Sequence, residues 1–460
     1  MIAQPEYIDE FSQLLQSINE GINLSKASLD YQVVLADIWL KAFTEVAQEF
    51  SYSQIKDENS RDLRQFLQVW SKTFDKEFNR RLRSEDVVFL QGKFLNRIIN
   101  YWGEKGQLMK DGLRFLTILS KINPISLLNL LHQDKIQVGV TPKVEIYRED
   151  KIVLYRFRPV VDSLNIPILI VYALVNRPYI VDLQEERSLV SNLLKLGLDV
   201  YLIDWGYPSS DDCWLTLDKY INGYINNCVD VVCAHRNLQQ INLLGICQGG
   251  TFSLCYSSLY PEKVKNLITT VTPVDFHIDE GLLNVWSGCT LGSQALDVDL
   301  MVDTLGNIPG DFLNFVFVML KPFQLGIDKY INLLEIIECE DKLLNFLRME
   351  KWIFDSPDQA GEAFRHFIKD FYQGNKLIKS EVEIGAKLVD LSNICIPILN
   401  IYAEQDHLVP PASSLALEKY VASNDYTVRS FPVGHIGIYV SSRVQKDLPS
   451  TIFDWLKVRV

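Results

Sequence analysis

The sequence predicts an α/β fold in which a parallel sheet carries helices on both faces. From about residue 140 onward, short apolar runs of strand length alternate with helical stretches, a pattern typical of parallel sheets. Within this region, residues 243–250 (LLGICQGG) join a buried strand to a helix through a glycine-rich turn. The alternation predicts the layers of the fold, and the turn marks the edge of the sheet where chemistry is expected.

The first block, residues 1–135, is predicted to be entirely helical. Glycine and proline are absent from residues 22–91, and so long a stretch without helix breakers is typical of helices. Apolar residues recur at helical spacing within residues 63–78 and 94–102. These apolar faces either pack into a helical bundle of their own or dock a second chain or an apolar surface.

The second block, residues 136–275, is predicted to form the first part of the α/β core. Its first two strands are expected to pair through a turn at residues 149–150, and Gly197 and Pro261 are expected to end two of its helices. The expected strands are 144–147, 152–157, 167–174, 199–205, 241–246 and 264–274, and the expected helices are 186–196, 217–235 and 251–260.

The alternation stops over residues 276–390, which are rich in aromatic residues and helical patterns but contain no clear strand. It resumes in the last block, residues 391–460. There the expected strands are 397–403 and 426–431, and the expected helices are 413–421 and 442–457. An interruption at this point is typical of a cap over an active site, and a separate domain is the alternative interpretation.

The segment GICQG at residues 245–249 matches a nucleophile elbow, with cysteine where serine is usual. In an elbow, a strained strand-to-helix turn presents its central side chain at the top of the sheet, and small flanking residues relieve the crowding. Together with the interruption, the elbow predicts an α/β-hydrolase fold with a cap inserted before the acid-bearing strand. The alternative is that Cys247 is simply a buried cysteine at a tight turn.

An acid and a histidine follow the cap in the order that this type of site requires. Asp406 comes just after one expected strand, and His435 comes just after the next. Side chains at the carboxyl ends of parallel strands point into the crevice above the sheet. His407 is an alternative base, and Glu404 is an alternative acid.

Four further residues of reactive type are expected to have structural roles. His277 and His366 fall in the cap and are expected to be packing or surface residues. Asp275 ends a strand and is expected to cap a helix, and Cys255 is expected to lie in the core.

The roles of the candidate catalytic residues follow from their chemistry. His435 is expected to take the thiol proton of Cys247, because the thiolate is the competent nucleophile. Asp406 is expected to hold the imidazole tautomer and to stabilise the imidazolium. Backbone N–H groups of Gln248 and Val175 are expected to form the oxyanion hole, since one donor follows the nucleophile and the other comes from the loop after residues 167–174.

The composition excludes several classes of protein. The 460 residues include 45 basic and 58 acidic ones and carry a net charge of −13, which argues against general nucleic-acid binding. No apolar stretch approaches the roughly 20 residues of a membrane-spanning helix, and the N-terminus lacks the pattern of a signal peptide. A cytoplasmic location is therefore expected, with the 8 cysteines as free thiols. Cysteine and histidine spacings indicate no metal site, and no cofactor is implied.

Cysteine as the nucleophile favours a transferase over a hydrolase. An acyl-cysteine is itself a thioester, so acyl transfer from a thioester substrate to Cys247 is nearly isoenergetic. The acyl group stays activated and can still acylate an alcohol downhill, whereas a serine ester would have lost that driving force. The chemistry therefore suggests acyl-thioesters such as acyl-CoA as substrates.

Several segments resemble polyhydroxyalkanoate synthases, most closely the class III catalytic subunit, from about residue 140 to the C-terminus. The segments are 171–179 (VYALVNRPY), 204–208 (DWGYP), 244–250 (LGICQGG), 274–276 (VDF), 371–375 (FYQGN), 406–410 (DHLVP) and 434–437 (GHIG). The resemblance implies polymerisation of (R)-3-hydroxyacyl-CoA, such as 3-hydroxybutyryl-CoA, into polyester with release of CoA. It also implies that Cys247, His435 and Asp406 match the nucleophile, base and acid of the family, and that the enzyme is a homodimer with a mobile cap on the surface of cytoplasmic polyester granules.

The N-terminal block departs from the class III catalytic subunit, which has no such extension. Residues 66–70 (FLQVW) and 92–96 (GKFLN) are similar to the helical partner subunit of class III enzymes. This similarity implies a fusion of partner-like helices to the catalytic part and leaves open whether a separate partner subunit is needed. The alternative functions are a cysteine-dependent thioesterase or hydrolase of the same fold, and an inactive granule-associated protein.

Overall fold

The computed structural model describes residues 80, 136–161, 164, 166–278, 283–284, 296–320, 336 and 339–459. The helical block predicted over residues 1–135 lies outside these residues, apart from Arg80, and Cys289 lies outside them as well. The chain divides into two compact units. One comprises residues 1–131, 285–306 and 311–346, and the other comprises residues 132–284, 307–310 and 347–460. The predicted boundaries at residues 135, 275 and 390 remain predictions.

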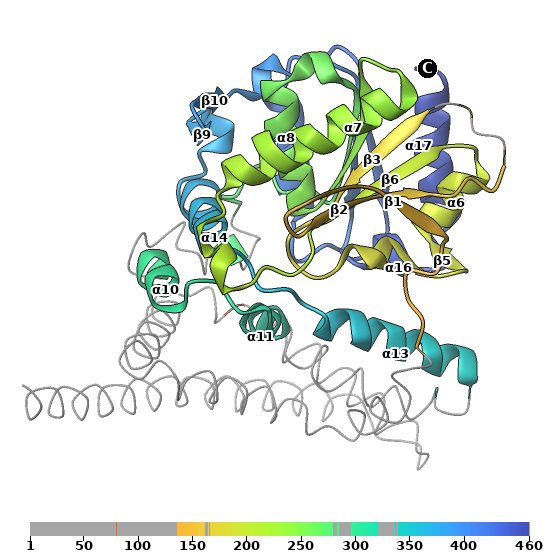
Figure 1. Cartoon of the computed structure of the whole chain (residues 1–460), viewed down its shortest axis with the longest axis horizontal. Coiled ribbons are helices and arrows are strands. Elements are labelled where there is room, and N and C mark those ends of the chain that lie inside the picture. The colour runs from red at the N-terminus through yellow and green to blue at the C-terminus, as the bar shows by residue number, and fades with distance from the viewer. Residues whose placement is uncertain are drawn as a thin grey trace, which may run out of the picture. The chain divides into compact units, whose positions relative to one another are not determined.

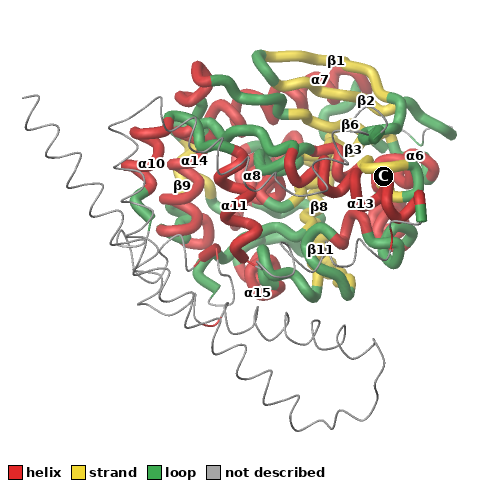
Figure 2. Tube along the Cα trace, turned by 90° about the horizontal axis from the view of Figure 1, so that it is seen from below, coloured by secondary structure: helices red, strands yellow, loops and turns green. Residues whose placement is uncertain are grey.

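In the described part of the chain, eight strands form the central sheet in the order β1-β2-β6-β3-β7-β8-β11-β12. In Figure 2 the labelled strands β1, β2, β6, β3, β8 and β11 follow one another across the sheet in this order. The strands are β1 Lys143–Glu149, β2 Ile152–Phe157, β3 Pro167–Val171, β6 Asp199–Asp204, β7 Ile241–Ile246, β8 Val264–Thr270, β11 Ile398–Ala403 and β12 Tyr426–Phe431. From β6 to β12 every neighbouring pair is parallel, whereas β1 and β2 pair antiparallel at one edge. The parallel sheet predicted from the strand–helix alternation is confirmed.

The central strands are buried on both faces, which explains why they are continuous apolar runs rather than alternating ones. In β3, Leu169 and Val171 point into one apolar cluster, and Ile168 and Ile170 point into the other. Helices α7 (Asn226–Arg236) and α8 (Gln248–Leu259) cover the first face, and α6 (Leu189–Lys195) and α17 (Asp447–Lys457) cover the second (Figure 1). This arrangement leaves the carboxyl ends of the parallel strands as the edge where loops meet.

Four of the expected helices are built differently from the prediction. The one expected at residues 413–421 consists of α15 (Pro411–Leu415) and the 3₁₀ helix η11 (Ala416–Lys419), and the one expected at residues 442–457 begins only at α17. The one expected at residues 186–196 begins only at α6, because β4 (Asp182–Gln184) and β5 (Arg187–Ser188) form a small hairpin before it. The one expected at residues 217–235 starts as a π-helix, η4 (Lys219–Ile225), and continues as α7.

Three strand predictions also need correction. The strand expected at residues 167–174 ends at Val171. The strand expected at residues 264–274 ends at Thr270, because Val271 adopts a φ of 43°, which a β-branched residue rarely adopts and which ends the extended backbone. Residues 276–390, expected to contain no strand, include the hairpin of β9 (Val382–Ile384) and β10 (Lys387–Val389). Its strands are too short to give a periodic signal.

The remaining helices lie in the segments that connect the elements named above. They are η2 Pro178–Val181, η3 Ser210–Trp214, η5 Pro261–Lys263, α10 Val298–Leu305, α11 Gly310–Leu320, α13 Glu340–Phe354, α14 Gly361–His366, η8 Phe367–Gln373, η9 Leu377–Lys379, η10 Leu391–Asn393 and α16 Gly437–Val440. Among the described residues, no helix is both long enough and apolar enough to cross a membrane.

Candidate active site

Cys247 occupies the turn between β7 and α8 with φ 53° and ψ −124°. A positive φ is uncommon for any residue other than glycine and is typical of strained functional turns. The backbone N–H of Cys247 donates to the carbonyl oxygen of Thr270 at 2.9 Å, and this bond ties the turn to the end of β8. The turn therefore has the geometry of a nucleophile elbow, and the Cys247 side chain is only partly buried.

Three glycines make this turn sterically possible. A Cβ added to Gly245 would lie 2.5 Å from the Cα of Gly250, and one added to Gly249 would lie 2.2 Å from the carbonyl oxygen of Val171. A Cβ on Gly250 would lie 1.9 Å from Oγ1 of Thr272. Each separation is far below any real Cβ contact, so the small residues are required by packing.

Asp406 and His435 form a buried pair at the carboxyl edge of the sheet. Asp406 follows β11 and His435 follows β12, and 2.6 Å separates Oδ2 of Asp406 from Nδ1 of His435. The other carboxylate oxygen of Asp406 accepts from the backbone N–H groups of Leu408 and Val409, each at 2.9 Å. One oxygen therefore fixes the loop, and the other orients the imidazole.

The electrostatic surroundings favour the imidazolium form of His435. Burial lowers the pKa of His435, but the charges of Asp406 and Cys247 and hydrogen bonds with both raise it more. The pKa of His435 consequently lies well above its usual value of 6.5. Since the ring interacts with the carboxylate and with the sulfur, the three residues predicted from the sequence lie together.

The two segments expected to form the oxyanion hole are in contact. The backbone N–H of Leu174 donates to Oε1 of Gln248 at 3.0 Å, so the loop after β3 is tied to the first residue of α8. Val175, the next residue, packs against the same apolar cluster as Cys247. The assignment of the Gln248 and Val175 N–H groups as oxyanion donors stays a prediction.

The alternative candidates have other partners. Oε1 of Glu404 accepts from the Ser430 hydroxyl at 2.7 Å at an exposed position. Oδ2 of Asp406 lies 2.6 Å from Nδ1 of His435, and the side chain of the adjacent His407 is partly buried. The geometry therefore favours Asp406 and His435 over Glu404 and His407.

The other reactive residues are accounted for by packing and turns. Cys255 is fully buried in the core, and His366 lies 3.1 Å from Asp370. In the part of the chain that the structure describes, the carboxylate of Asp275 caps no helix, contrary to the prediction. It accepts instead from the backbone N–H of His277 at 3.0 Å and from the Asn375 amide at 2.8 Å.

Three tyrosines near Cys247 were not found from the sequence. Burial raises the pKa of Tyr172, Tyr372 and Tyr439, and negative charge on Cys247 adds to the rise in each case. Tyr439 donates to Oγ1 of Thr270 at 2.9 Å, the residue whose carbonyl holds the elbow. The tyrosines come from three distant parts of the chain, so no local pattern could identify them.

The described residues include no cluster of three or more histidine, cysteine, aspartate or glutamate side chains that could hold a metal ion. The seven cysteines within these residues are free thiols, as Cys247 must be to act as a nucleophile.

Known proteins resemble this chain in sequence. A family model described as the alpha/beta hydrolase fold matches residues 166–442. The poly(3-hydroxyalkanoate) polymerase subunit PhaC of Synechocystis sp. is 67% identical over 331 residues, which are 72% of this chain and 88% of the relative. The PhaC subunits of Thiocystis violacea and Allochromatium vinosum are 57% and 56% identical, and each match covers 72% of this chain and 92% of the relative. The chain therefore belongs to the α/β-hydrolase fold family and, within it, to the family of poly(3-hydroxyalkanoate) polymerase subunits PhaC.

Proposed function

We propose that this protein is an acyltransferase that polymerises (R)-3-hydroxyacyl-CoA, with 3-hydroxybutyryl-CoA as substrate, into polyester and releases CoA. The observation that carries the proposal is the placement of Cys247 at the elbow beside the buried Asp406–His435 pair, in a chain of the PhaC family.

In the first half-reaction, Cys247 is acylated. His435 holds the proton of the thiol, and the thiolate attacks the thioester carbonyl. The tetrahedral intermediate is stabilised by the N–H groups of Gln248 and Val175. The C–S bond to CoA then breaks, and the departing thiolate takes the proton from His435. The high pKa of His435 supports its service as a proton store during this step.

In the second half-reaction, the hydroxyl of the growing chain attacks the acyl-cysteine. His435 takes the hydroxyl proton, an ester C–O bond forms, and the bond from the acyl carbon to the sulfur of Cys247 breaks. The thiolate of Cys247 is released beside the protonated His435, which is the state in which the cycle began, so the cycle is balanced without a cofactor. Because a thioester is converted to an ester, this half-reaction runs downhill.

Burial of the reacting groups favours transfer to the chain over hydrolysis. His435 is 5% exposed and Asp406 is 7% exposed, and three tyrosines interact with Cys247. Exclusion of water protects a reactive acyl intermediate. In this proposal the enzyme works as a homodimer on the surface of cytoplasmic polyester granules.

The test uses the purified full chain alone with (R)-3-hydroxybutyryl-CoA. Free CoA is followed with a thiol reagent and polymer is followed by turbidity in the same sample, with Cys247→Ala as the matched control. We expect CoA release with rising turbidity, and a loss of at least about 10⁴-fold in the variant, because the nucleophile is removed. Activity of the wild-type chain alone would also mean that no separate partner subunit is required.

Three outcomes would contradict the proposal. CoA release with a clear solution and free 3-hydroxybutyrate would identify a hydrolase. More than a few per cent of activity in Cys247→Ala would remove Cys247 from its role. Absence of CoA release together with binding to polyester granules would indicate an inactive granule-associated protein.

A further inference from the structure

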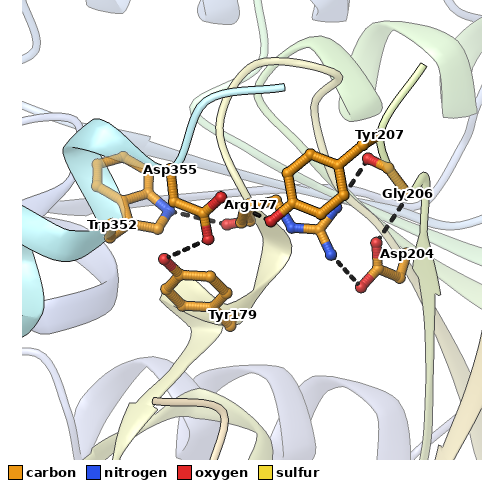
Figure 3. Close-up of polar contacts among 7 residues, drawn as sticks. All are labelled: Arg177, Tyr179, Asp204, Gly206, Tyr207, Trp352 and Asp355. Carbon is orange, nitrogen blue, oxygen red and sulfur yellow. Dashed lines mark hydrogen bonds and ion pairs between the residues drawn. The ribbon is translucent and has the colours of Figure 1, made fainter. Parts of the chain in front are cut away.

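The loop after β3 is held by a group of polar contacts that the catalytic residues do not explain (Figure 3). The contacts join this loop, the loop after β6 and the C-terminal end of α13. We call the group the clasp, and it consists of Asn176, Arg177, Tyr179, Tyr207, Trp352 and Asp355.

Asp355, just beyond α13, receives one phenol from each of the two loops. Its Oδ2 accepts from Tyr179 at 2.9 Å and its Oδ1 accepts from Tyr207 at 2.6 Å. In Figure 3 the carboxylate lies between the two rings. A single side chain therefore fixes the positions of both loops relative to the end of the helix.

Two further bonds tie the two residues that follow Val175 to the end of α13. The indole Nε1 of Trp352 donates to the carbonyl oxygen of Arg177 at 2.8 Å. The amide of Asn176 donates to the carbonyl oxygen of Ile353 at 3.3 Å. Asn176 has a φ of 58°, a conformation that asparagine tolerates better than most residues, so the bond holds a backbone bend directly after Val175.

Arg177 completes the connection to β6. Its guanidinium donates to Asp204 at 2.7 Å and to the carbonyl oxygen of Gly206 at 2.8 Å, and it lies 4.2 Å from the ring centroid of Tyr207. The side chains of Arg177 and Asp204 are only 12% and 15% exposed, so salt screens this ion pair less than it screens a surface pair.

Both phenols keep their protons over the whole physiological range. Burial, with the hydrogen bond to Asp355, raises the pKa of Tyr207 to about 12, and burial and Asp355 also raise the pKa of Tyr179. Both phenols can therefore donate to Asp355 in this range.

Val175 lies between two anchored residues. On one side Leu174 is bonded to Gln248, and on the other Asn176 and Arg177 are bonded to the end of α13. An oxyanion donor is effective only if it is held at hydrogen-bond distance from the place where the charge develops.

We propose that Asp355 and Trp352 are positioning residues, which hold the loop after β3 so that the N–H of Val175 faces the oxyanion formed at Cys247. This assignment rests on the proposed acyl-transfer function. Neither residue touches the substrate, and both act through the loop.

Two reactions of Cys247 separate this role from a general effect on folding. Acylation by (R)-3-hydroxybutyryl-CoA passes through a tetrahedral oxyanion, whereas alkylation by iodoacetamide displaces iodide and forms no oxyanion. A misplaced Val175 should therefore slow acylation and spare alkylation.

The variants are Trp352→Phe, which keeps the ring and removes the N–H donor, and Asp355→Asn, which replaces one acceptor oxygen by a donor. The matched control is Tyr201→Phe, which removes a phenol–carboxylate bond to Asp199 at the opposite end of β6. CoA release is measured in a single turnover with enzyme in excess, alkylation of Cys247 is measured by peptide mass spectrometry, and KM is measured in steady state.

In Trp352→Phe and Asp355→Asn we expect the rate of acylation to fall about 10- to 100-fold. This loss is at most about as large as the loss caused by removing one oxyanion-hole donor completely. Alkylation should stay within about twofold, and KM within about threefold, because the lost interaction acts in the transition state. Tyr201→Phe should leave acylation and alkylation unchanged.

A parallel fall of acylation and alkylation in the two variants would overturn the proposal, because it would indicate general disruption of the site. Unchanged acylation would overturn it as well. If the wild-type chain itself forms no acyl-enzyme, the proposed function fails, and this result is distinct from a failure of the positioning role.

Discussion

The position of the Cys247 side chain depends on the backbone conformation of the residue. A φ of 53° at this residue lifts the sulfur away from the end of β7, and the bond from its N–H to Thr270 holds it there. Strain of this kind persists only where the surroundings determine it. The nucleophile is therefore positioned before any substrate binds.

At the residue scale, we predict that His435 is protonated above pH 6.5 and that Cys247→Ala lowers its pKa. Below a raised pKa the proton stays bound, so the imidazolium persists at pH values where an ordinary histidine is neutral. Charge on Cys247 and its hydrogen bond are among the causes of the rise, so their removal should reverse part of it. The pKa of His435 is measured in the wild-type chain and in Cys247→Ala by following ¹⁵N-histidine chemical shifts as a function of pH.

His277→Gln, which removes a ring bonded to backbone carbonyl oxygens in the cap region, is the control and should leave the His435 titration unchanged. A wild-type titration centred near 6.5, or one identical in Cys247→Ala, would contradict the prediction.

At the scale of elements, β11 carries a buried asparagine that links it to its neighbours. Asn400 is fully buried and accepts from the hydroxyls of Thr269 in β8 and Ser414 in α15, at 3.0 and 3.1 Å. Its amide donates to the phenol oxygen of Tyr426 in β12 at 3.0 Å. A polar residue in the middle of a buried strand is tolerated here because its hydrogen bonds are satisfied.

We predict that Asn400→Ala lowers the free energy of unfolding by roughly 1–3 kcal/mol, because several buried polar groups lose their partner. Urea denaturation followed by circular dichroism measures the change. Asn227→Ala, which removes one bond to Glu149 at a half-buried position, should cost less than about 1 kcal/mol. If both variants lost the same free energy of unfolding, the buried hydrogen bonds of Asn400 would contribute no more to stability than the single bond of Asn227.

The sequence predicted some elements to the residue and others only roughly. The expected strands at 241–246 and 426–431 coincide with β7 and β12. The π-helices η4 and η8 could not be foreseen, because one extra residue in a turn hardly changes the spacing of apolar positions. The end of β8 was missed because it depends on the backbone of Val271 alone.

The candidate site was predictable to a similar extent. The order of Cys247, Asp406 and His435 along the chain, each after a strand, indicated their meeting at one edge of the sheet. The tyrosines around Cys247 and the clasp were not predictable, because their contacts join segments that are far apart in the sequence, such as Tyr179 and Asp355, which are 176 positions apart. Long-range contacts of this kind leave no local pattern.

At the scale of the whole molecule, the cysteines differ sharply in their surroundings. Cys339 and Cys395 are exposed, whereas Cys228 and Cys255 are buried. Burial raises the pKa of Cys255 to about 12 and also raises that of Cys228. The thiolate is the reactive form. Burial and the high pKa therefore both slow the reaction of Cys228 and Cys255 with a thiol reagent.

We therefore predict that iodoacetamide labels Cys247, Cys339 and Cys395 in the folded protein and labels Cys228 and Cys255 at least about 100-fold more slowly, because alkylation of these two requires unfolding. Peptide mass spectrometry after timed quenching measures each site. The same reaction in 8 M urea is the control and should label all of them. Rapid labelling of Cys255 in the folded protein would contradict the buried core described for α8.

The three glycines of the elbow also bear on how this sequence can change during evolution. Any replacement of Gly249 meets the backbone of Val171 at 2.2 Å, and no second mutation can remove a backbone oxygen. The partly exposed side chain of Cys247 meets no such barrier, and a single nucleotide change converts a cysteine codon to serine. The nucleophile can therefore change from one lineage to another while the glycine turn that presents it stays the same. Proteins descended from one ancestor with this turn can in this way come to catalyse different reactions.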